Sequence, residues 1–272
     1  MLPVLHIGSF HIATYAVAYA VMIIVCGMYI FHRFFVEYND HNRILWGLAA
    51  GLAGGAIGAW VVSKIPVIWY WAQSGKWQPT TGGAFIGMLP GGALAVALYS
   101  RWRNRDPWHI LDRAAVVMPL GQAIIRVGCF SAGCCYGKPT TAWWGMYLRN
   151  IHGEWAVRYP TQLIYLFINL AIWQTLRAVE RYGQQRAKQT WGRAPQAPQI
   201  WPFNGFVALL YADLYWLKRF GTEFLRADGI LTLGGINWAY ILSACGFVVT
   251  TALLIRRLRA RPQRQPIGVE ES

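Results

Sequence analysis

The fold class is decided by residues 11–31, which read HIATYAVAYAVMIIVCGMYIF. No Lys, Arg, Asp or Glu occurs between Met1 and His32, and about 20 apolar residues in a helix cover the hydrocarbon core of a bilayer. A cleaved signal peptide would begin with a basic segment, which this sequence lacks. The stretch therefore predicts a transmembrane helix that stays in the protein.

Similar runs recur along the chain. Four more uncharged stretches are long enough to cross a membrane, namely 44–63, 77–100, 159–176 and 229–255. Two further apolar stretches contain charges: 108–130 holds Asp112, Arg113 and Arg126, and 201–220 holds Asp213 and ends at Lys218 and Arg219, which we count with the following loop. A charge inside a bilayer is costly, so each of these should face the bundle interior and have a partner or a function. We predict an all-α polytopic membrane protein with about seven transmembrane helices.

Composition favours one membrane domain. Hydrophobic residues make up 56% of the chain and charged residues 13%, about half the charged share of a soluble protein. We expect a single membrane-embedded domain over residues 1–260 and a cytoplasmic tail over 261–272. The net charge of +14 would suggest nucleic-acid binding in a soluble protein, but basic loops on a membrane protein explain it, so we expect no nucleic-acid partner.

The basic residues also predict an orientation. With seven spans, the loops alternate between the two sides of the membrane. The side that holds the C-terminal tail carries nearly twice as many Lys and Arg residues as the opposite side. Cytoplasmic loops carry the excess of basic residues, so we expect a periplasmic N-terminus and a cytoplasmic C-terminus. Residues 177–198, rich in Gln, Arg, Ala and Pro, are predicted to form a solvated cytoplasmic connection.

Glycines recur at intervals of four in the second and third predicted spans, between residues 47 and 58 and between 83 and 92. Small residues at this spacing allow two helices to pack closely. The alternative is a close approach of the backbone to a lipid.

Two separate segments bring cations to the periplasmic side in this orientation. The stretch 108–130 ends near Arg126, and 201–220 leads to Arg219, Glu223 and Arg226, which share one face if the helix continues. Guanidinium groups suit bidentate binding of phosphate, so an anionic phospholipid headgroup is the natural ligand. The alternative is that these side chains only reach the interface and pair with each other. Asp213 or Glu223 could be the counter-ion of Arg126.

Three of the five cysteines, Cys129, Cys134 and Cys135, cluster in the turn-forming segment after Arg126. They are compatible with tight packing, with redox or nucleophilic thiol chemistry, or with a metal site. Metal is the weakest of the three interpretations, because paired ligands usually have two to four intervening residues and no second pair exists. We therefore treat the cluster as a candidate thiol site and expect no bound metal.

Taken together, four blocks of sequence resemble the prolipoprotein diacylglyceryl transferase family. They are RVGCFSAGCCYG (126–137), the preceding TTGGAFIGMLPGG (80–92), and the following YPTQL (159–163) and RFGTEFLR (219–226). The resemblance implies a multi-pass enzyme of the bacterial inner membrane, without cofactor, that moves the diacylglyceryl group of phosphatidylglycerol to the lipobox cysteine thiol of a prolipoprotein signal peptide. Membrane lipids would be its surroundings.

The resemblance also implies roles for individual residues. Arg126 and Arg219 would stabilise the charge on the departing phosphate. Phospholipid binding would involve Tyr15, Tyr215, Glu223, Arg226, Gly128 and Gly137, and Asp112 also falls where the family has Asp.

The chain departs from the family pattern at four positions. The family usually has Asn at Cys129, Glu at Cys134, and His at Ile86 and at Tyr159. Two rival functions follow: a paralogous membrane enzyme that uses the three cysteines for thiol chemistry, and a membrane protein that binds anionic lipid without catalysis.

Overall fold

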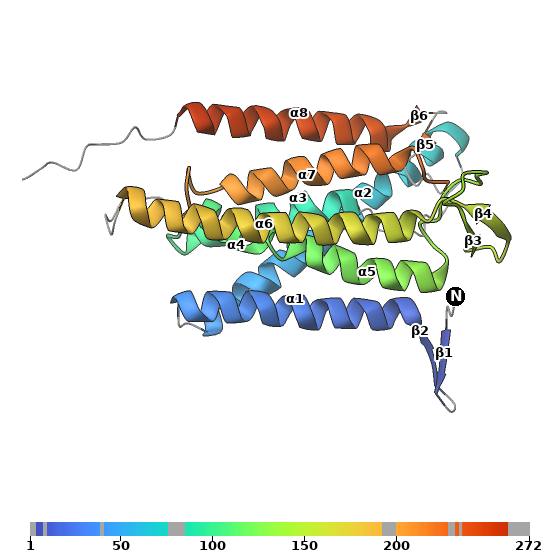
Figure 1. The fold of residues 1–272 in the computed structure, drawn as a ribbon, viewed down its shortest axis with the longest axis horizontal. Helices are drawn as coiled ribbons and strands as arrows, with labels where there is room; N and C mark the ends of the chain where they lie inside the picture. The colour runs from blue at the N-terminus through green and yellow to red at the C-terminus, as the bar shows by residue number, and fades with distance from the viewer. Residues whose placement is uncertain are drawn as a thin grey trace, which may run out of the picture.

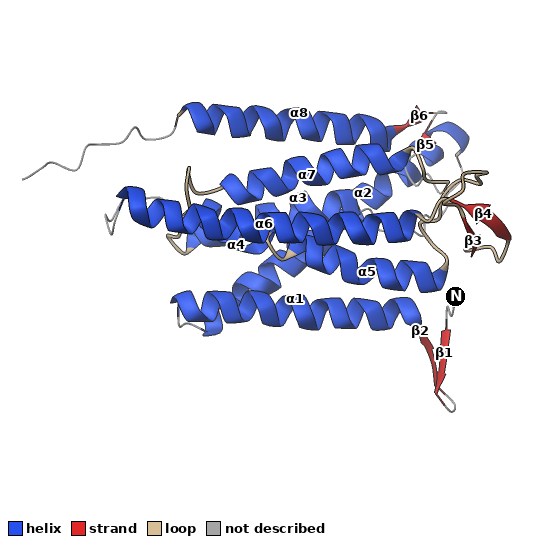
Figure 2. Cartoon of the chain, in the orientation of Figure 1, coloured by secondary structure: helices blue, strands red, loops and turns tan. Residues whose placement is uncertain are grey.

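The computed structural model describes residues 4–7, 10–38, 41–75, 85–191, 200–227, 232–233 and 236–260. Over these ranges the chain is mostly helical, and the longer helices run side by side along one axis (Figures 1 and 2). The helices are α1 (Thr14–Tyr38), α2 (His41–Ser74), α3 (Phe85–Trp102), α4 (Pro107–Ala115), α5 (Met118–Ala132), α6 (Thr161–Trp191), α7 (Phe206–Glu223) and α8 (Trp238–Arg259). The prediction of a helical fold is confirmed.

Three short antiparallel hairpins lie outside the helices. They are β1 (Val4–Ile7) with β2 (Phe10–Ala13), β3 (Met146–Arg149) with β4 (Trp155–Arg158), and β5 (Thr232–Leu233) with β6 (Ile236–Asn237). All three are found at one end of the helical bundle, where α5 ends and α6 begins (Figure 1).

Four stretches of the described chain are long and apolar enough to cross a membrane: Thr14–Phe35, Ile44–Ser74, Pro107–Ala132 and Trp238–Arg259. The third joins α4 and α5. A membrane protein is therefore supported, while the full set of seven spans stays a prediction. Residues 77–84 of the third predicted span, and the tail 261–272, lie outside the described residues.

The predicted solvated connection at 177–198 is wrong over its first part, because α6 continues to Trp191. Residues 192–198 lie outside the described part. Glu180 is buried in this extension and accepts hydrogen bonds from Arg33 of α1 and Arg113 of α4. Arg, Gln, Ala and Glu are all favourable in helices, so this composition did not require an irregular segment.

Helices α2 and α3 pack closely through their glycines, as predicted for the described positions. A Cβ atom on Gly58 would overlap the carbonyl group of Gly87, and one on Gly91 would lie 3.0 Å from the Cα atom of Gly58. The two backbones are therefore in direct contact, and larger side chains would push the helices apart.

Two interior carboxylates hold helices together. Asp112 is fully buried and accepts hydrogen bonds from the backbone N–H groups of Gly205 at 2.6 Å and Ala208 at 2.8 Å, which satisfies the first turn of α7. Asp213 on α7 accepts hydrogen bonds from Thr250 and Thr251 on α8. Both charges have structural partners, which excludes Asp213 as the predicted counter-ion of Arg126.

Candidate active site

The candidate residues come together at the end of the bundle that carries the hairpins. Residues 133–140, which follow α5, lie between β4 and the segment after α7. Lys138 N–H donates to the carbonyl of Leu225 at 2.8 Å, and Tyr159 N–H donates to the carbonyl of Lys138 at 3.1 Å. A backbone bridge also pairs Gly137 with Arg226. The loop after α5 is thus hydrogen-bonded on both sides to segments that are distant in sequence.

Arg219 and Glu223 form a buried ion pair on the last turn of α7. Arg219 Nη2 lies 3.0 Å from Glu223 Oε2, and Arg219 Nη1 donates to the hydroxyl of Tyr165 at 3.0 Å. Asn237 Nδ2 donates to the other carboxylate oxygen of Glu223 at 2.9 Å. Glu223 therefore orients the Arg219 side chain.

Arg126 on α5 reaches the same tyrosine from another side. Its guanidinium carbon lies 4.4 Å from the centre of the Tyr165 ring, and Nη1 lies 3.8 Å from the sulfur of Cys129. Glu223 is paired with Arg219, so neither proposed counter-ion serves Arg126. Within the described chain Arg126 contacts an aromatic face and a thiol but no carboxylate, so no carboxylate there offsets its positive charge.

Arg226 does not continue the helical face of Arg219 and Glu223, because α7 ends at Glu223. It arrives at the site through its backbone bridge to Gly137 and is 6% exposed. The expected helical face is therefore wrong for Arg226, which lies beside the loop after α5 through its backbone and not through continuation of α7.

Lys218 was not among the site residues predicted from the sequence. It stands next to Arg219 at the end of an apolar stretch, so it was counted as a cation of the periplasmic loop. It is buried, and Nζ donates to Gln122 Oε1 and to Asn169 Oδ1, both at 2.6 Å. The ammonium also lies 5.0 Å from the centre of the Tyr215 ring. Its position inside an otherwise apolar stretch is the signal that could have identified it.

Tyr165 was also missed, although it stands four residues after Thr161 in the YPTQL block. It is 2% exposed and links Arg126 to Arg219, the first through its ring face and the second through its hydroxyl. We call Arg126, Tyr165, Lys218, Arg219, Glu223 and Arg226 the cationic cluster.

The four remaining candidates border the cationic cluster or the loop beside it. Tyr215 is buried on α7 next to Lys218. Tyr15, on the first turn of α1, packs against Gly128, where an added Cβ atom would lie 3.3 Å from the Cα atom of Tyr15 and 2.6 Å from Ala18 Cβ. A Cβ atom on Gly137 would overlap the carbonyl of Tyr159. Both glycines thus permit close contact between backbone segments.

The three clustered cysteines are free thiols whose sulfur atoms all lie within 4.8 Å of one another. Thr161 Oγ1 donates to the carbonyl of Cys135 at 2.6 Å, and Gln162 Nε2 donates to that of Cys134 at 3.0 Å, which anchors the loop on α6. Hydrogen bonds from the thiols of Cys129 and Cys134, together with the charges of the nearby arginines, lower the pKa of Cys135 well below its ordinary value. We call these three residues the cysteine cluster.

A large apolar cavity of about 560 Å³ lies within the bundle, next to Tyr215. It is lined by residues of α1, α2, α3, α4, α5, α7 and α8, among them Phe34, Leu48, Met88, Val96, Met118 and Tyr211. Its size and lining suit a long apolar chain.

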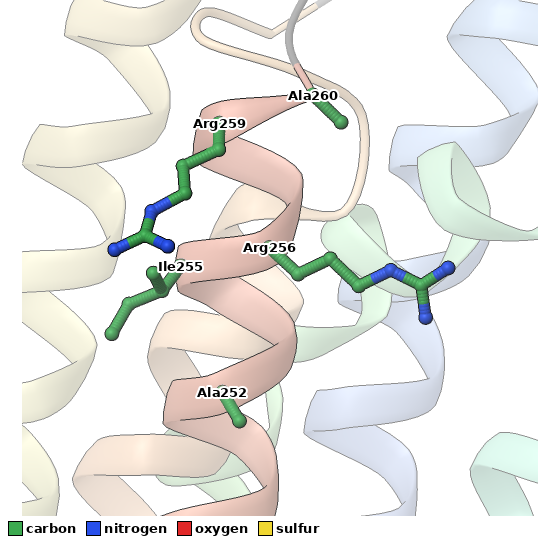
Figure 3. Close-up of a pocket in the computed structure, with 5 residues that line it drawn as sticks. All are labelled: Ala252, Ile255, Arg256, Arg259 and Ala260. Atoms are coloured by element: carbon green, nitrogen blue, oxygen red, sulfur yellow. The ribbon is translucent and has the colours of Figure 1, made fainter.

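A second hollow, of about 600 Å³, lies at the C-terminal end of α8 (Figure 3). It is lined by Ala252, Ile255, Arg256, Arg259 and Ala260, and the two arginines point in opposite directions. No group converges there, so it does not form a site.

Comparisons with known proteins agree with this arrangement. The sequence model of the prolipoprotein diacylglyceryl transferase family matches residues 3–256. Three similar proteins are named phosphatidylglycerol–prolipoprotein diacylglyceryl transferase. The Clostridium tetani protein is 29% identical over 70% of this chain and 71% of its own length. A Campylobacter jejuni protein is 26% identical over 82% and 79%, and the Leifsonia xyli protein is 25% identical over 91% and 75%, respectively.

Proposed function

Since this chain belongs to the prolipoprotein diacylglyceryl transferase family, we propose that it transfers the diacylglyceryl group of phosphatidylglycerol to a cysteine thiol of a prolipoprotein. It is then a transferase of lipoprotein biosynthesis. One observation carries the assignment. Arg126 of α5 and Arg219 of α7 contact the same residue, Tyr165, the first at its ring face and the second at its hydroxyl.

The reaction needs a stabilised leaving group. The thiolate attacks the terminal glyceryl carbon of the diacylglycerol, a carbon–sulfur bond forms, and the carbon–oxygen bond to the phosphate breaks, which releases glycerol phosphate. Negative charge grows on the departing phosphate. Preorganised guanidinium groups in a partly dehydrated site stabilise that charge more than they stabilise the intact lipid.

The surplus of positive charge in the cationic cluster supports an anionic substrate. In the described chain Arg126 and Lys218 have amide, thiol and aromatic neighbours, whereas Glu223 pairs with Arg219. A phosphate that enters would supply the missing counter-charge. Tyr15 and Tyr215 border this region and would donate hydrogen bonds to the headgroup.

The apolar cavity would hold acyl chains. It adjoins Tyr215, so a lipid with its phosphate on the cationic cluster could extend its tails among α2, α3 and α7. In this binding mode the headgroup would lie toward the end of the bundle that carries the hairpins, and the acyl chains would lie toward its middle.

The full topology belongs to the same proposal: seven spans in the bacterial inner membrane, with the N-terminus and the catalytic end periplasmic. The basic loops support it. A reporter fused after Arg264 should give a cytoplasmic signal, and a periplasmic signal would contradict this orientation.

The activity is tested with membranes that contain the full chain, radiolabelled phosphatidylglycerol and a lipobox peptide. Label should move to the peptide in proportion to the amount of protein, and a peptide with Ser in place of its Cys should remain unlabelled. Complementation of a strain depleted of its own diacylglyceryl transferase provides the test in cells. Bound phosphatidylglycerol without labelled peptide would favour a lipid-binding protein instead.

A further inference from the structure

We propose that the cysteine cluster binds one zinc ion through three thiolates and that the fourth position on zinc takes the acceptor thiol. The metal site stands on the geometry of the loop after α5. Its part in the reaction rests on the function proposed above.

The sulfur atoms are close to the spacing that zinc requires. A tetrahedral zinc with Zn–S bonds of about 2.3 Å separates its sulfurs by about 3.8 Å, and here all three lie within 4.8 Å of one another. Rotation of the side chains can remove the difference of about 1 Å.

The backbone explains how two adjacent cysteines can face the same point. Cys135 has a φ angle of 58°, in the left-handed region that residues other than glycine seldom adopt. The carbonyl groups of Cys134 and Cys135 are held by Gln162 and Thr161 of α6. This conformation turns both thiols toward Cys129, so the sequence spacing that argued against a metal site is overcome by the fold.

The surrounding charges favour bound thiolates. Three thiolates and Zn²⁺ carry a net charge of −1, and Arg126 Nη1 lies 3.8 Å from the sulfur of Cys129. A donor next to a ligand atom is the usual outer partner of a metal site. Arginine has five N–H donors, so this contact leaves others for a phosphate.

An open fourth position has a chemical use at this place. Zinc with three protein ligands and one free position is the catalytic arrangement, and a thiol that coordinates zinc is deprotonated. The acceptor thiol would lose its proton to solvent and remain bound as a thiolate. It would then attack the glyceryl carbon, while the phosphate leaves with the bonding electron pair toward Arg126 and Arg219.

The carboxylate of the cationic cluster is already engaged. Glu223 pairs with Arg219 and accepts a hydrogen bond from Asn237, so it does not serve as the base for the acceptor thiol. Metal coordination would supply the deprotonation without a side-chain base.

The binding test uses the full chain purified in detergent without chelators. Metal analysis should find about one zinc per chain. Cobalt added to the metal-free protein should produce the intense sulfur-to-cobalt absorption of a thiolate site. Cys129→Ser, Cys134→Ser and Cys135→Ser should each remove most of the zinc and this absorption. Cys245→Ser is the matched control, because Cys245 is an exposed thiol on α8, and it should retain both signals.

The activity test uses the labelled-lipid assay. A zinc chelator should lower peptide lipidation at least 100-fold, and added zinc should restore it. Zinc bound stoichiometrically with no lipidation would support the metal site and contradict the proposed function. Lipidation by zinc-free protein, at the rate of the zinc-loaded protein, would overturn the inference and leave the proposed function intact.

Two further results would also overturn the metal site. One is the absence of both zinc and the cobalt absorption from reduced wild-type protein that elutes as a single species. The other is a disulfide within the cysteine cluster that persists in active protein, detected by mass spectrometry as a loss of two hydrogens.

Discussion

The two ends of the helical bundle treat buried cations differently. At one end Arg33 of α1 and Arg113 of α4 both donate to Glu180 of α6, so the carboxylate ties three helices together. At the other end Arg126 and Lys218 contact a thiol, amides and aromatic rings, and Glu223 serves Arg219. The first end pairs its cations with a carboxylate, whereas at the second end Arg126 and Lys218 have no carboxylate partner among the described residues, which is why we propose that an anionic ligand binds there.

We use this difference to predict which cations are structural and which serve the reaction. A buried charge costs free energy unless a partner compensates for it, so a fold gains little by keeping two cations without a carboxylate. Charged residues inside apolar stretches therefore do not all indicate function. Arg113 and Arg126 occur in the same predicted span, yet among the described residues Arg113 pairs with a carboxylate and Arg126 does not, so we predict a structural role for Arg113 and a catalytic role for Arg126.

The largest effect should come from replacing the arginines of the cationic cluster with lysine, compared with the same change at the Glu180 end. Arg126→Lys and Arg219→Lys keep the charge but lose the planar fork. Each should lower turnover by about 100-fold or more, by analogy with the removal of one donor from an oxyanion site, and should change the apparent lipid affinity less. The measurement is the initial rate of peptide lipidation against phosphatidylglycerol concentration.

Arg113→Lys is the matched control for these variants at the Glu180 end. Its turnover per folded molecule should stay within about threefold of wild type, because lysine can still pair with Glu180. Equal losses of turnover at both ends would remove the distinction between them.

Lys218→Met should have the next largest effect. Methionine keeps most of the length but removes the charge, and loss of one cation near a phosphate is expected to cost about 10-fold in turnover. The same lipidation assay measures it, with Leu217→Met, at an exposed position on the same helix, as the control. An unchanged rate would assign Lys218 to the structure alone.

Glu180→Gln should act on stability and leave catalysis intact. It removes the charge shared by Arg33 and Arg113, so we expect the free energy of unfolding to fall by about 2 kcal/mol. Thermal unfolding in detergent measures the change, alongside the lipidation rate of the folded fraction at low temperature. A loss of rate without a loss of stability would mean that this end also serves the reaction.

The smallest expected effect is that of Asp112→Asn. Asparagine keeps one acceptor oxygen of the two that bind Gly205 and Ala208, so the start of α7 should lose about 1 kcal/mol. The melting temperature should fall slightly and turnover should be nearly unchanged. A large loss of turnover with normal stability would give Asp112 a role beyond capping.

The sequence by itself determined the helical class, the membrane character, the close packing of α2 and α3, and the family. These depend on local patterns: uncharged runs of spanning length, glycines spaced by one helical turn, and blocks of residues such as RFGTEFLR. Arg126, Arg219 and Glu223 could be selected for the same reason, since a charge in an apolar stretch is visible without knowledge of the fold.

Only the tertiary structure decided which partner each charge has. Asp112 and Asp213 accept hydrogen bonds from neighbouring helices. Lys218 was expected in a loop and is buried beside Gln122, and Tyr165 contacts both Arg126 and Arg219. The cysteine spacing argued against a metal site, and the left-handed turn at Cys135 brought three sulfurs together. Such contacts join residues up to about 100 positions apart and depend on side-chain direction, which spacing along one helix or loop does not encode.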